Sequence, residues 1–372
     1  MRILHLSDLH LGKRVFEMSM LPEQRVILEQ ALEMAKLADV TVIAGDIYDR
    51  QVPPAEAVAL FDDFLTRMNG QGSRVIMISG NHDSAERIAF GAGLLDASGI
   101  YVSPVYDGKA RRVELCDEHG AVHIHLLPFV KPAHVRAALD DEGIEGYTAA
   151  IRAAVEHMEI DPQARNVLIA HQFVTGSLRS ESEEVSVGGL DNVDADVFEA
   201  FDYVALGHLH AAQSLCGGKV RYCGAPLAYA FSESGCVKGA LLVQLGKKGE
   251  LDTQTLPFSQ LHRMSRLRGA FDELYDPEKT VQDYLQITLT DEDDVPDAAR
   301  KLMQVYPNLL QVVYDNARTR AMAADFGVQT QTARSPMEMF ETLFAMQNGK
   351  DMTDAQRAYL GGMMETIWED EA

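Results

Sequence analysis

Five short apolar segments, each ending in a polar motif, constrain the fold of this 372-residue chain more than any other feature. They cover residues 2–7, 40–44, 74–79, 167–170 and 203–206. Continuous apolar runs of this length are typical of strands that are buried on both faces of a sheet. Helical patterns separate the first three segments, and this alternation predicts βαβ units around a mainly parallel central sheet.

The two intervening helices are predicted from apolar residues at helical spacing. The expected buried faces are Leu28, Ala31, Leu32 and Ala35 in the first helix, and Val58, Phe61, Leu65 and Met68 in the second. The second helix is expected to open after Pro53 and Pro54, because proline is favoured at the start of a helix.

The sequence as a whole predicts three domains. Short strands at residues 101–127 and 219–256 indicate a second, more antiparallel layer within a first domain at residues 1–260. A small α+β domain at residues 261–328 is expected to contain strands at 284–290 and 309–314 around a helix at 295–306. Residues 329–372 are expected to be helical, since Ser335–Glu338 and Thr353–Gln356 have the pattern of capping boxes.

The polar motifs that follow the apolar segments carry side chains of the metal-ligand type. They contribute Asp8, His10, Asp46, Asn81, His171, His208 and His210. Ligand sites in open α/β sheets form beyond the carboxyl ends of the strands, where all of these residues are expected. Asp8 and His10 alternate with Leu9, and an extended segment would point both the same way.

This ligand set predicts a site for two divalent cations and phosphoester hydrolysis. Two metal ions lower the pKa of a bound water and clamp the phosphate oxygens. Asp46 can offer one carboxylate oxygen to each ion, and Asn81 offers a neutral amide oxygen. Mixed aspartate, histidine and asparagine ligands suit manganese, iron or zinc better than magnesium alone.

Composition excludes several other classes. The net charge of −23 argues against a chain that binds nucleic acid through a basic surface of its own. No apolar run reaches 18 residues and no cleavage site follows the N-terminal segment, so neither a membrane span nor a signal peptide is expected. The four cysteines have no CxxC spacing, and we expect reduced thiols in the cytoplasm.

The motifs DxH, GD, GNHD, a single His and GHxH, in this order, resemble the calcineurin-like metallophosphoesterases. The segments AGDIYDRQVPP at 44–54, SEEVSVGG at 182–189 and YCGAPLAYAFSES at 222–234 are most similar to the SbcD branch, the nuclease subunits of bacterial SbcC–SbcD DNA repair complexes. The resemblance implies an α/β fold in which helices flank a metallophosphoesterase β-sandwich, followed by a small α+β capping domain and a helical C-terminal segment.

The resemblance also assigns roles to single residues. One cation is held by Asp8, His10, Asp46 and His210, and the other by Asp46, Asn81, His171 and His208. His82 protonates the leaving oxygen or stabilises the transition state, and Asp49 orients His82. Arg50 is open to two interpretations, a contact to substrate phosphate or an ordinary surface arginine.

At the level of the whole protein, the resemblance implies a manganese-dependent DNA exonuclease and endonuclease that processes double-strand breaks and DNA ends in the cytoplasm, at the nucleoid. An SbcC-like ATPase is expected to bind the C-terminal helices and to supply the DNA-binding surface. A homodimer is expected to form through the first domain. Two alternatives are a phosphoprotein or small-molecule phosphatase, and a non-catalytic scaffold. The segments after residue 260 speak against the first, and the intact ligand set speaks against the second.

Overall fold

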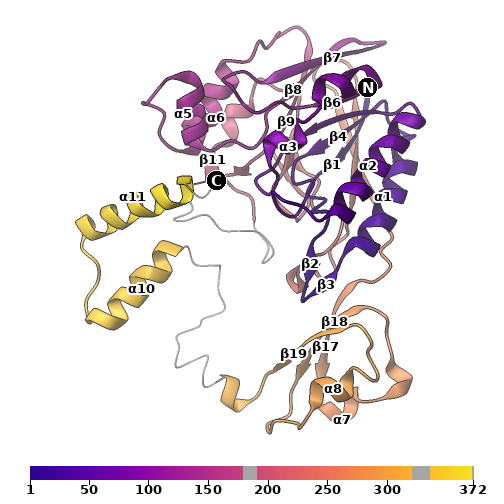
Figure 1. Cartoon of the computed structure of the whole chain (residues 1–372), viewed down its shortest axis with the longest axis vertical. Coiled ribbons are helices and arrows are strands. Elements are labelled where there is room, and N and C mark those ends of the chain that lie inside the picture. Colours follow the sequence, from indigo (N-terminus) through magenta and orange to yellow (C-terminus); the bar gives the residue numbers. More distant parts are fainter. Residues whose placement is uncertain (179–190, 321–335, 371–372) are drawn as a thin grey trace.

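Two six-stranded sheets form the centre of the molecule (Figure 1). The computed structural model describes residues 1–178, 191–320 and 336–370, and the statements below concern these residues. Apolar side chains from both sheets, among them Val42, Ile76, Ile124 and Ile169, meet in one buried cluster. The two sheets therefore pack face to face as a sandwich.

The first sheet has the strand order β16-β15-β1-β4-β5-β6. Its parallel strands are β1 (Arg2–Leu6), β4 (Val40–Ala44), β5 (Arg74–Ile78) and β6 (Ile100–Val102), and the antiparallel strands β15 (Gly239–Leu245) and β16 (Leu251–Pro257) extend it beside β1. A minor hairpin, β2 (Arg14–Val15) and β3 (Met18–Ser19), follows β1. The predicted parallel βαβ arrangement of the first three segments is confirmed.

The second sheet is mixed and no more antiparallel than the first, so the expectation of a second, more antiparallel layer is wrong. Its order is β13 (Gln213–Leu215), β14 (Val220–Tyr222), β12 (Tyr203–Gly207), β9 (Arg165–His171), β8 (Gly120–Leu126) and β7 (Arg111–Asp117). The four inner strands are parallel, and only the two edge strands are antiparallel. The fourth and fifth apolar segments thus belong to this sheet rather than to the first. A two-stranded ladder of β10 (Phe173–Val174) and β11 (Asn192–Val193) lies outside it.

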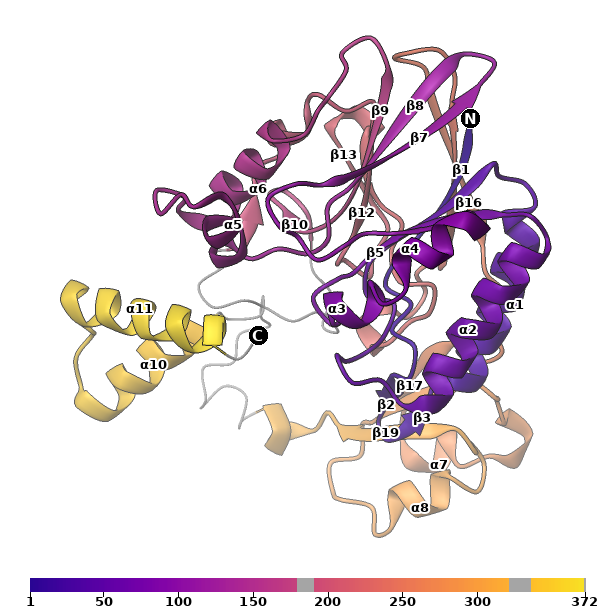
Figure 2. The same ribbon diagram turned by 45° about the horizontal axis from the view of Figure 1, so that its top comes forward.

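Helices cover both outer faces of the sandwich (Figure 2). On the first sheet lie α1 (Leu21–Ala35) and α2 (Ala55–Gly70), with the short α3 (Ala85–Ile88) and α4 (Ala92–Leu95) beside them. The second sheet is covered by α5 (Pro132–Leu139) and α6 (Gly146–Glu156). The architecture is therefore an α/β sandwich flanked by helices, as predicted.

The predicted face of α1 is buried, whereas that of α2 needs a correction. Phe61 and Met68 are buried, but Val58 is 43% exposed. The buried stripe instead includes Ala57, Leu60 and Phe64. The face is shifted by about one position, because it includes the fully buried Ala57, a small residue that the apolar pattern undervalues.

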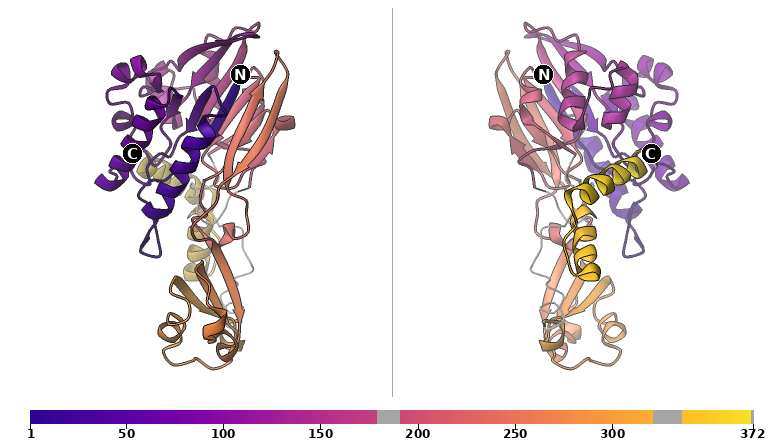
Figure 3. Two further views of the ribbon diagram at one scale, coloured as in Figure 1. Left: turned by 90° about the vertical axis from the view of Figure 1, so that its right-hand side faces the viewer. Right: turned by 90° about the vertical axis from the view of Figure 1, so that its left-hand side faces the viewer.

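A small α+β unit follows, with a hydrophobic cluster of its own (Figure 3). Its three parallel strands are β17 (Met264–Gly269), β18 (Tyr284–Leu289) and β19 (Leu309–Tyr314), and its helices are α7 (Phe271–Leu274) and α8 (Ala298–Leu302). Both expected strands are present. The helix is shorter than residues 295–306, and β17 was not predicted because arginines interrupt its apolar pattern.

Two helices form the C-terminal part, α10 (Pro336–Asn348) and α11 (Asp354–Asp370). The predicted capping box at the start of α11 is present, since the Thr353 N–H donates to Gln356 Oε1 at 3.0 Å and the Gln356 N–H donates to Thr353 Oγ1 at 3.3 Å. The loop at 182–189 and the expected boundary at 328/329 lie outside the described residues. Among the helices that are described, none has the length and apolar character needed to cross a bilayer.

Candidate metal centre

The seven candidate ligands come together at the carboxyl ends of strands from both sheets. β1 and β4 are parallel neighbours in the first sheet, and β9 and β12 are parallel neighbours in the second. The loops that follow these strands, together with the loop after β5, therefore open toward the same region. Gly207, the last residue of β12, pairs directly with His171 of β9 in the second sheet.

The backbone at the site is not extended, which corrects the expected geometry of Asp8 and His10. Their φ angles are 53° and 44°, and Asp46 and His208 also have positive values, 51° and 100°. Such angles are rare for residues other than glycine and cost free energy. Hydrogen bonds fix this geometry, because the Asp8 N–H donates to Gly45 O at 3.1 Å and the His10 N–H donates to Asp46 O at 2.9 Å.

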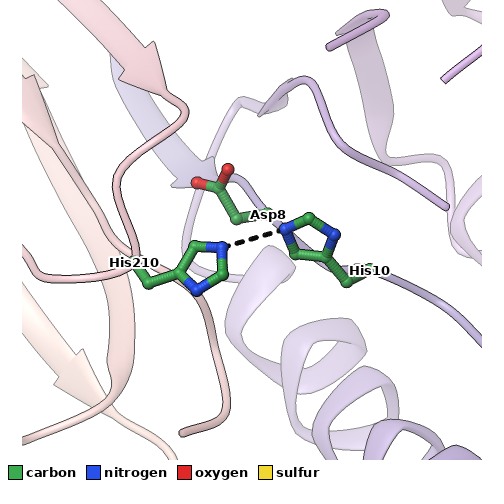
Figure 4. A group of neighbouring side chains, drawn as sticks. All are labelled: Asp8, His10 and His210. Carbon is green, nitrogen blue, oxygen red and sulfur yellow. Dashed lines mark hydrogen bonds between the residues drawn. The ribbon is translucent and has the colours of Figure 1, made fainter. Parts of the chain in front are cut away.

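Asp8, His10 and His210 form the first group of converging donors (Figure 4). One ligand atom of each lies within 4.8 Å of the others. The Nε2 atoms of His10 and His210 are 3.0 Å apart. All three side chains are buried, and burial raises the pKa of Asp8 to about 6 against the opposing effect of nearby histidines. A bound cation would hold this carboxylate ionised.

Asp46 lies at the centre of the site. Its Oδ2 is 3.6 Å from His10 Nε2 and 3.3 Å from His171 Nε2, so it faces histidines from both sheets. Burial opposes the ionisation of the Asp46–His171 pair, but mutual attraction outweighs it. Asp46 raises the pKa of His171 to about 9, and His171 holds the pKa of Asp46 well below its usual value. Such a carboxylate is suited to bridge two cations.

Asn81 joins two histidines on the other side of Asp46. Its Oδ1 lies 3.0 Å from His171 Nε2 and 3.0 Å from His208 Nδ1. The Nδ1 atom of His171 contacts Ala44 O at 2.8 Å, an arrangement that makes Nδ1 a donor, so loss of the Nε2 proton to a cation would leave the Nε2 lone pair toward the site. The site thus gathers carboxylate, imidazole and amide donors, and this donor set fits two borderline divalent cations.

The three other candidate residues lie at different distances from this centre. The ring of His82 lies edge-on to that of His10, with 4.8 Å between their centroids. His82 Nδ1 contacts the backbone carbonyl of Asp49 at 3.0 Å, whereas the Asp49 carboxylate accepts a hydrogen bond from Lys13 at 2.6 Å. Asp49 therefore contacts His82 through its main chain. Arg50 points outward, is 59% exposed and lies 3.8 Å from Asp49.

Glycine allows the loops to approach one another this closely. A Cβ atom on Gly80 would lie 2.1 Å from Asp46 Oδ1, and one on Gly207 would lie 1.9 Å from Ala44 O. At Gly207 the overlap cannot be relieved by the movement of a flexible side chain, because the neighbouring atom belongs to the backbone. The glycines of the GNHD and GHxH motifs are thus required by packing at the site.

Sequence reasoning missed three residues that shape the site. The buried carboxylate of Asp83 accepts backbone hydrogen bonds from Ile47, Tyr48 and Gly80 at 2.9–3.1 Å, and thereby ties two ligand loops together. Gln24 donates to His10 O at 2.7 Å and to Tyr229 Oη at 3.1 Å. The GNHD motif contained a signal for Asp83, and Tyr229 lies in the segment 222–234 that carries the family resemblance, but no local pattern marks Gln24.

Two sequence families match this chain. Residues 1–212, more than half of the chain, match the model of the calcineurin-like phosphoesterases. Residues 260–348 match the SbcD C-terminal family, which is described as the Type 5 capsule protein repressor C-terminal domain. The first match spans all seven candidate ligands, and the second spans the small α+β unit and α10.

Proposed function

We propose, from the premise that this chain belongs to the calcineurin-like phosphoesterase family and is of the SbcD type, that it is a manganese-dependent DNA nuclease. Hydrolysis of phosphoester bonds follows from the family. The observation that carries the proposal is the convergence of Asp8, His10, Asp46, His171 and His210 at one buried centre, in a chain that also has the SbcD C-terminal domain.

The ligand assignment divides the donors between two cations. Asp8, His10, Asp46 and His210 would hold one, and Asp46, Asn81, His171 and His208 would hold the other. Bound divalent cations supply a nucleophile at neutral pH and positive charge against the phosphorane. The residues of the chain prepare the site for them, because strained backbone and hydrogen bonds fix the ligand loops in advance.

His82 is the proposed general acid. With Nδ1 held by the Asp49 carbonyl oxygen, its Nε2 atom is the one that remains to act on a leaving oxygen. Asp49 acts as a positioning residue through its carbonyl, and its carboxylate holds Lys13 at the rim. Arg50 is a candidate for a substrate phosphate contact, because its guanidinium is exposed beside this rim.

Apolar surface on the C-terminal helices supports docking of an SbcC-like ATPase. Met339, Leu343 and Met346 on α10 and Tyr359 on α11 are 52–74% exposed. Apolar faces of amphipathic helices are typical partner-binding surfaces. The proposed domains are 1–260 for the nuclease, 261–328 for the cap and 329–372 for partner binding.

A second apolar surface, on the chain that follows the GNHD motif, supports the expected homodimer. Phe90 and Leu94, at and near the short helices α3 and α4, are 86% and 84% exposed. Large apolar side chains that are exposed this fully, here four positions apart in the chain, are typical of interaction surfaces. A DNA substrate and an ATPase partner would place the protein in the cytoplasm, at the nucleoid.

The purified chain incubated with linear duplex DNA and Mn²⁺ tests the proposal. We expect degradation that a chelator abolishes and that His82→Ala slows about 100- to 10,000-fold, the range typical of a lost general acid. Mn²⁺ binding should be unchanged in His82→Ala, because His82 is not an assigned ligand.

The alternative is a phosphoprotein or small-molecule phosphatase, which the family match permits. Para-nitrophenyl phosphate and a phosphopeptide should therefore be assayed in parallel. Rapid turnover of the phosphopeptide, with duplex DNA left intact at the same Mn²⁺ concentration, would reject the nuclease in favour of the phosphatase.

A further inference from the structure

A buried ion pair lies directly behind His210, on the side away from the candidate metal centre. It consists of Glu233, at the end of a short helical turn, and Lys238, the residue before β15. Their side chains are only 2% and 3% exposed in the pair. Neither residue belongs to the motifs that predicted the ligands.

The pair contacts His210 at two points. Lys238 Nζ donates to the His210 carbonyl oxygen at 2.8 Å and also to Glu233 Oε2. Glu233 Oε1 lies 3.8 Å from His210 Nδ1 and accepts a hydrogen bond from the Tyr229 N–H at 3.4 Å. Both the backbone and the ring of His210 are therefore in contact with the pair.

The ring orientation of His210 is consistent with this arrangement. Its Nε2 atom faces His10, and its other ring nitrogen points away from both His10 and Asp8 (Figure 4). That second nitrogen is the one that faces Glu233. A carboxylate at this position favours a proton on Nδ1 and leaves the Nε2 lone pair toward a cation.

Stability alone does not account for the pair. Burying two charges costs hydration free energy, and their mutual attraction offsets little more than this cost. Apolar residues of similar volume would therefore stabilise the fold as well or better. The surrounding structure nevertheless fixes both charges in place. Ser234 Oγ donates to Met264 O at 2.9 Å, and the Lys238 carbonyl accepts from the Phe258 N–H at 2.8 Å.

We propose that Glu233 and Lys238 are positioning residues, which set the tautomer and the ring orientation of His210 for a divalent cation. This inference rests on the proposed role of His210 as a metal ligand. Lys238 fixes the His210 backbone and the Glu233 carboxylate together, and Glu233 in turn fixes the ring. The pair thereby keeps one cation position formed before a cation binds.

Titration of the full-length chain with Mn²⁺ by calorimetry tests this role. Glu233→Gln keeps the size of the side chain but removes its charge, and we expect one of two Mn²⁺ sites to bind about 10- to 100-fold more weakly. The second site should keep its affinity. Hydrolysis should recover when the Mn²⁺ concentration is raised by the same factor. The double variant Glu233→Gln with Lys238→Met should show the same selective loss, without leaving an unpaired buried lysine.

Asp117→Asn is the control, because Asp117, whose side chain is 12% exposed, forms an ion pair with Arg165 at the opposite ends of the strands, away from the candidate metal centre. It should lower thermal stability without changing Mn²⁺ affinity. Wild-type affinity at both sites in Glu233→Gln and in the double variant would overturn the positioning role while leaving the metal centre intact. A wild-type chain that binds no Mn²⁺ would instead overturn the proposed function and this inference together.

Discussion

Glycine at position 80 illustrates how single residues set the geometry of the centre. The His82 N–H donates to Asp46 Oδ1 at 2.9 Å, and the Gly80 N–H donates to Asp83 Oδ2 at 2.9 Å. These bonds bring the loop after β5 against Asp46. An added methyl group at Gly80 would occupy the space of the Asp46 carboxylate.

We therefore expect Gly80→Ala to destabilise the fold by about 1–3 kcal/mol, the usual cost of overpacking, and to remove Mn²⁺ binding. Thermal unfolding and calorimetric titration measure the two effects. Gly70→Ala is the control, since nothing lies within 4 Å of its Cβ position at the end of α2. It should be neutral or stabilising by up to about 1 kcal/mol. Equal Mn²⁺ affinity in both variants would contradict this account of Gly80.

The candidate ligands could be found from the sequence because each follows a recognisable apolar segment. The residues that support them could not. Gln24 and Tyr229 meet across 205 positions of the chain, and neither belongs to a ligand motif. Glu233 and Lys238 are likewise ordinary charged residues until the fold buries them. Contacts of this kind depend on tertiary packing, which leaves no local pattern in a single sequence.

At the scale of elements, the bounds of the central strands were predictable because buried parallel strands have continuous apolar runs. The segment at 40–44 is β4 as expected. Which sheet each run joins was not predictable, since β9 and β12 look the same in sequence as β1 and β4. Strand pairing is decided by connections such as the segment between β8 and β9, whose helices α5 and α6 cover the second sheet.

A cluster of ion pairs lies at the amino ends of β1 and β9, away from the metal centre. This cluster predicts that the free energy of unfolding depends on pH. Asp117 pairs with Arg165 at 2.5 Å and with the amino group of Met1. Arg165 and the N-terminus hold the pKa of Asp117 well below its usual range, despite partial burial. A carboxyl with a depressed folded pKa stabilises the fold above its unfolded pKa of about 4, and this contribution disappears as the pH falls through the folded value.

Asp117→Asn should thus lose about 1–3 kcal/mol of unfolding free energy at pH 7, the usual value for hydrogen bonds to charged groups. The difference in unfolding free energy between the variant and the wild type should shrink as the pH falls below about 4, because the stabilisation by the ionised wild-type carboxylate begins to decrease there. Urea unfolding at several pH values measures this. A difference that stays constant down to about pH 2 would show that charge is not the cause.

At the scale of the whole molecule, helix α1 connects the sandwich to the small α+β unit. Glu23 is buried and lies next to Gln24, which contacts the metal centre. Glu23 Oε1 lies 2.6 Å from His262 Nδ1 and accepts from Tyr284 Oη at 3.2 Å. Burial and the nearby Glu23 raise the pKa of Tyr284 to about 12, so it remains a neutral donor.

We expect Glu23→Gln to loosen this joint, because the substitution removes the charge that attracts His262. Hydrogen exchange at β17 should become faster, while exchange within β4 and β9 should be unchanged. Glu29→Gln on the same helix is the control, since its pairing with Arg67 is exposed and contributes at most about 1 kcal/mol. Equal exchange at β17 in both variants would argue against a joint held by Glu23.

The charge of the whole chain makes a last prediction about DNA binding. The sequence has 33 lysines and arginines against 56 aspartates and glutamates. Phosphate contacts supply most nonspecific affinity, and each one steepens the dependence of binding on salt. We therefore expect the chain alone to bind duplex DNA weakly and with a shallow salt slope, and the ATPase partner to raise both affinity and slope. Fluorescence anisotropy over a range of salt concentrations measures both. If the chain alone gave a salt dependence as steep as that of about six to ten phosphate contacts, the DNA-binding surface would lie on this chain. That result would contradict the proposal that the ATPase partner supplies this surface.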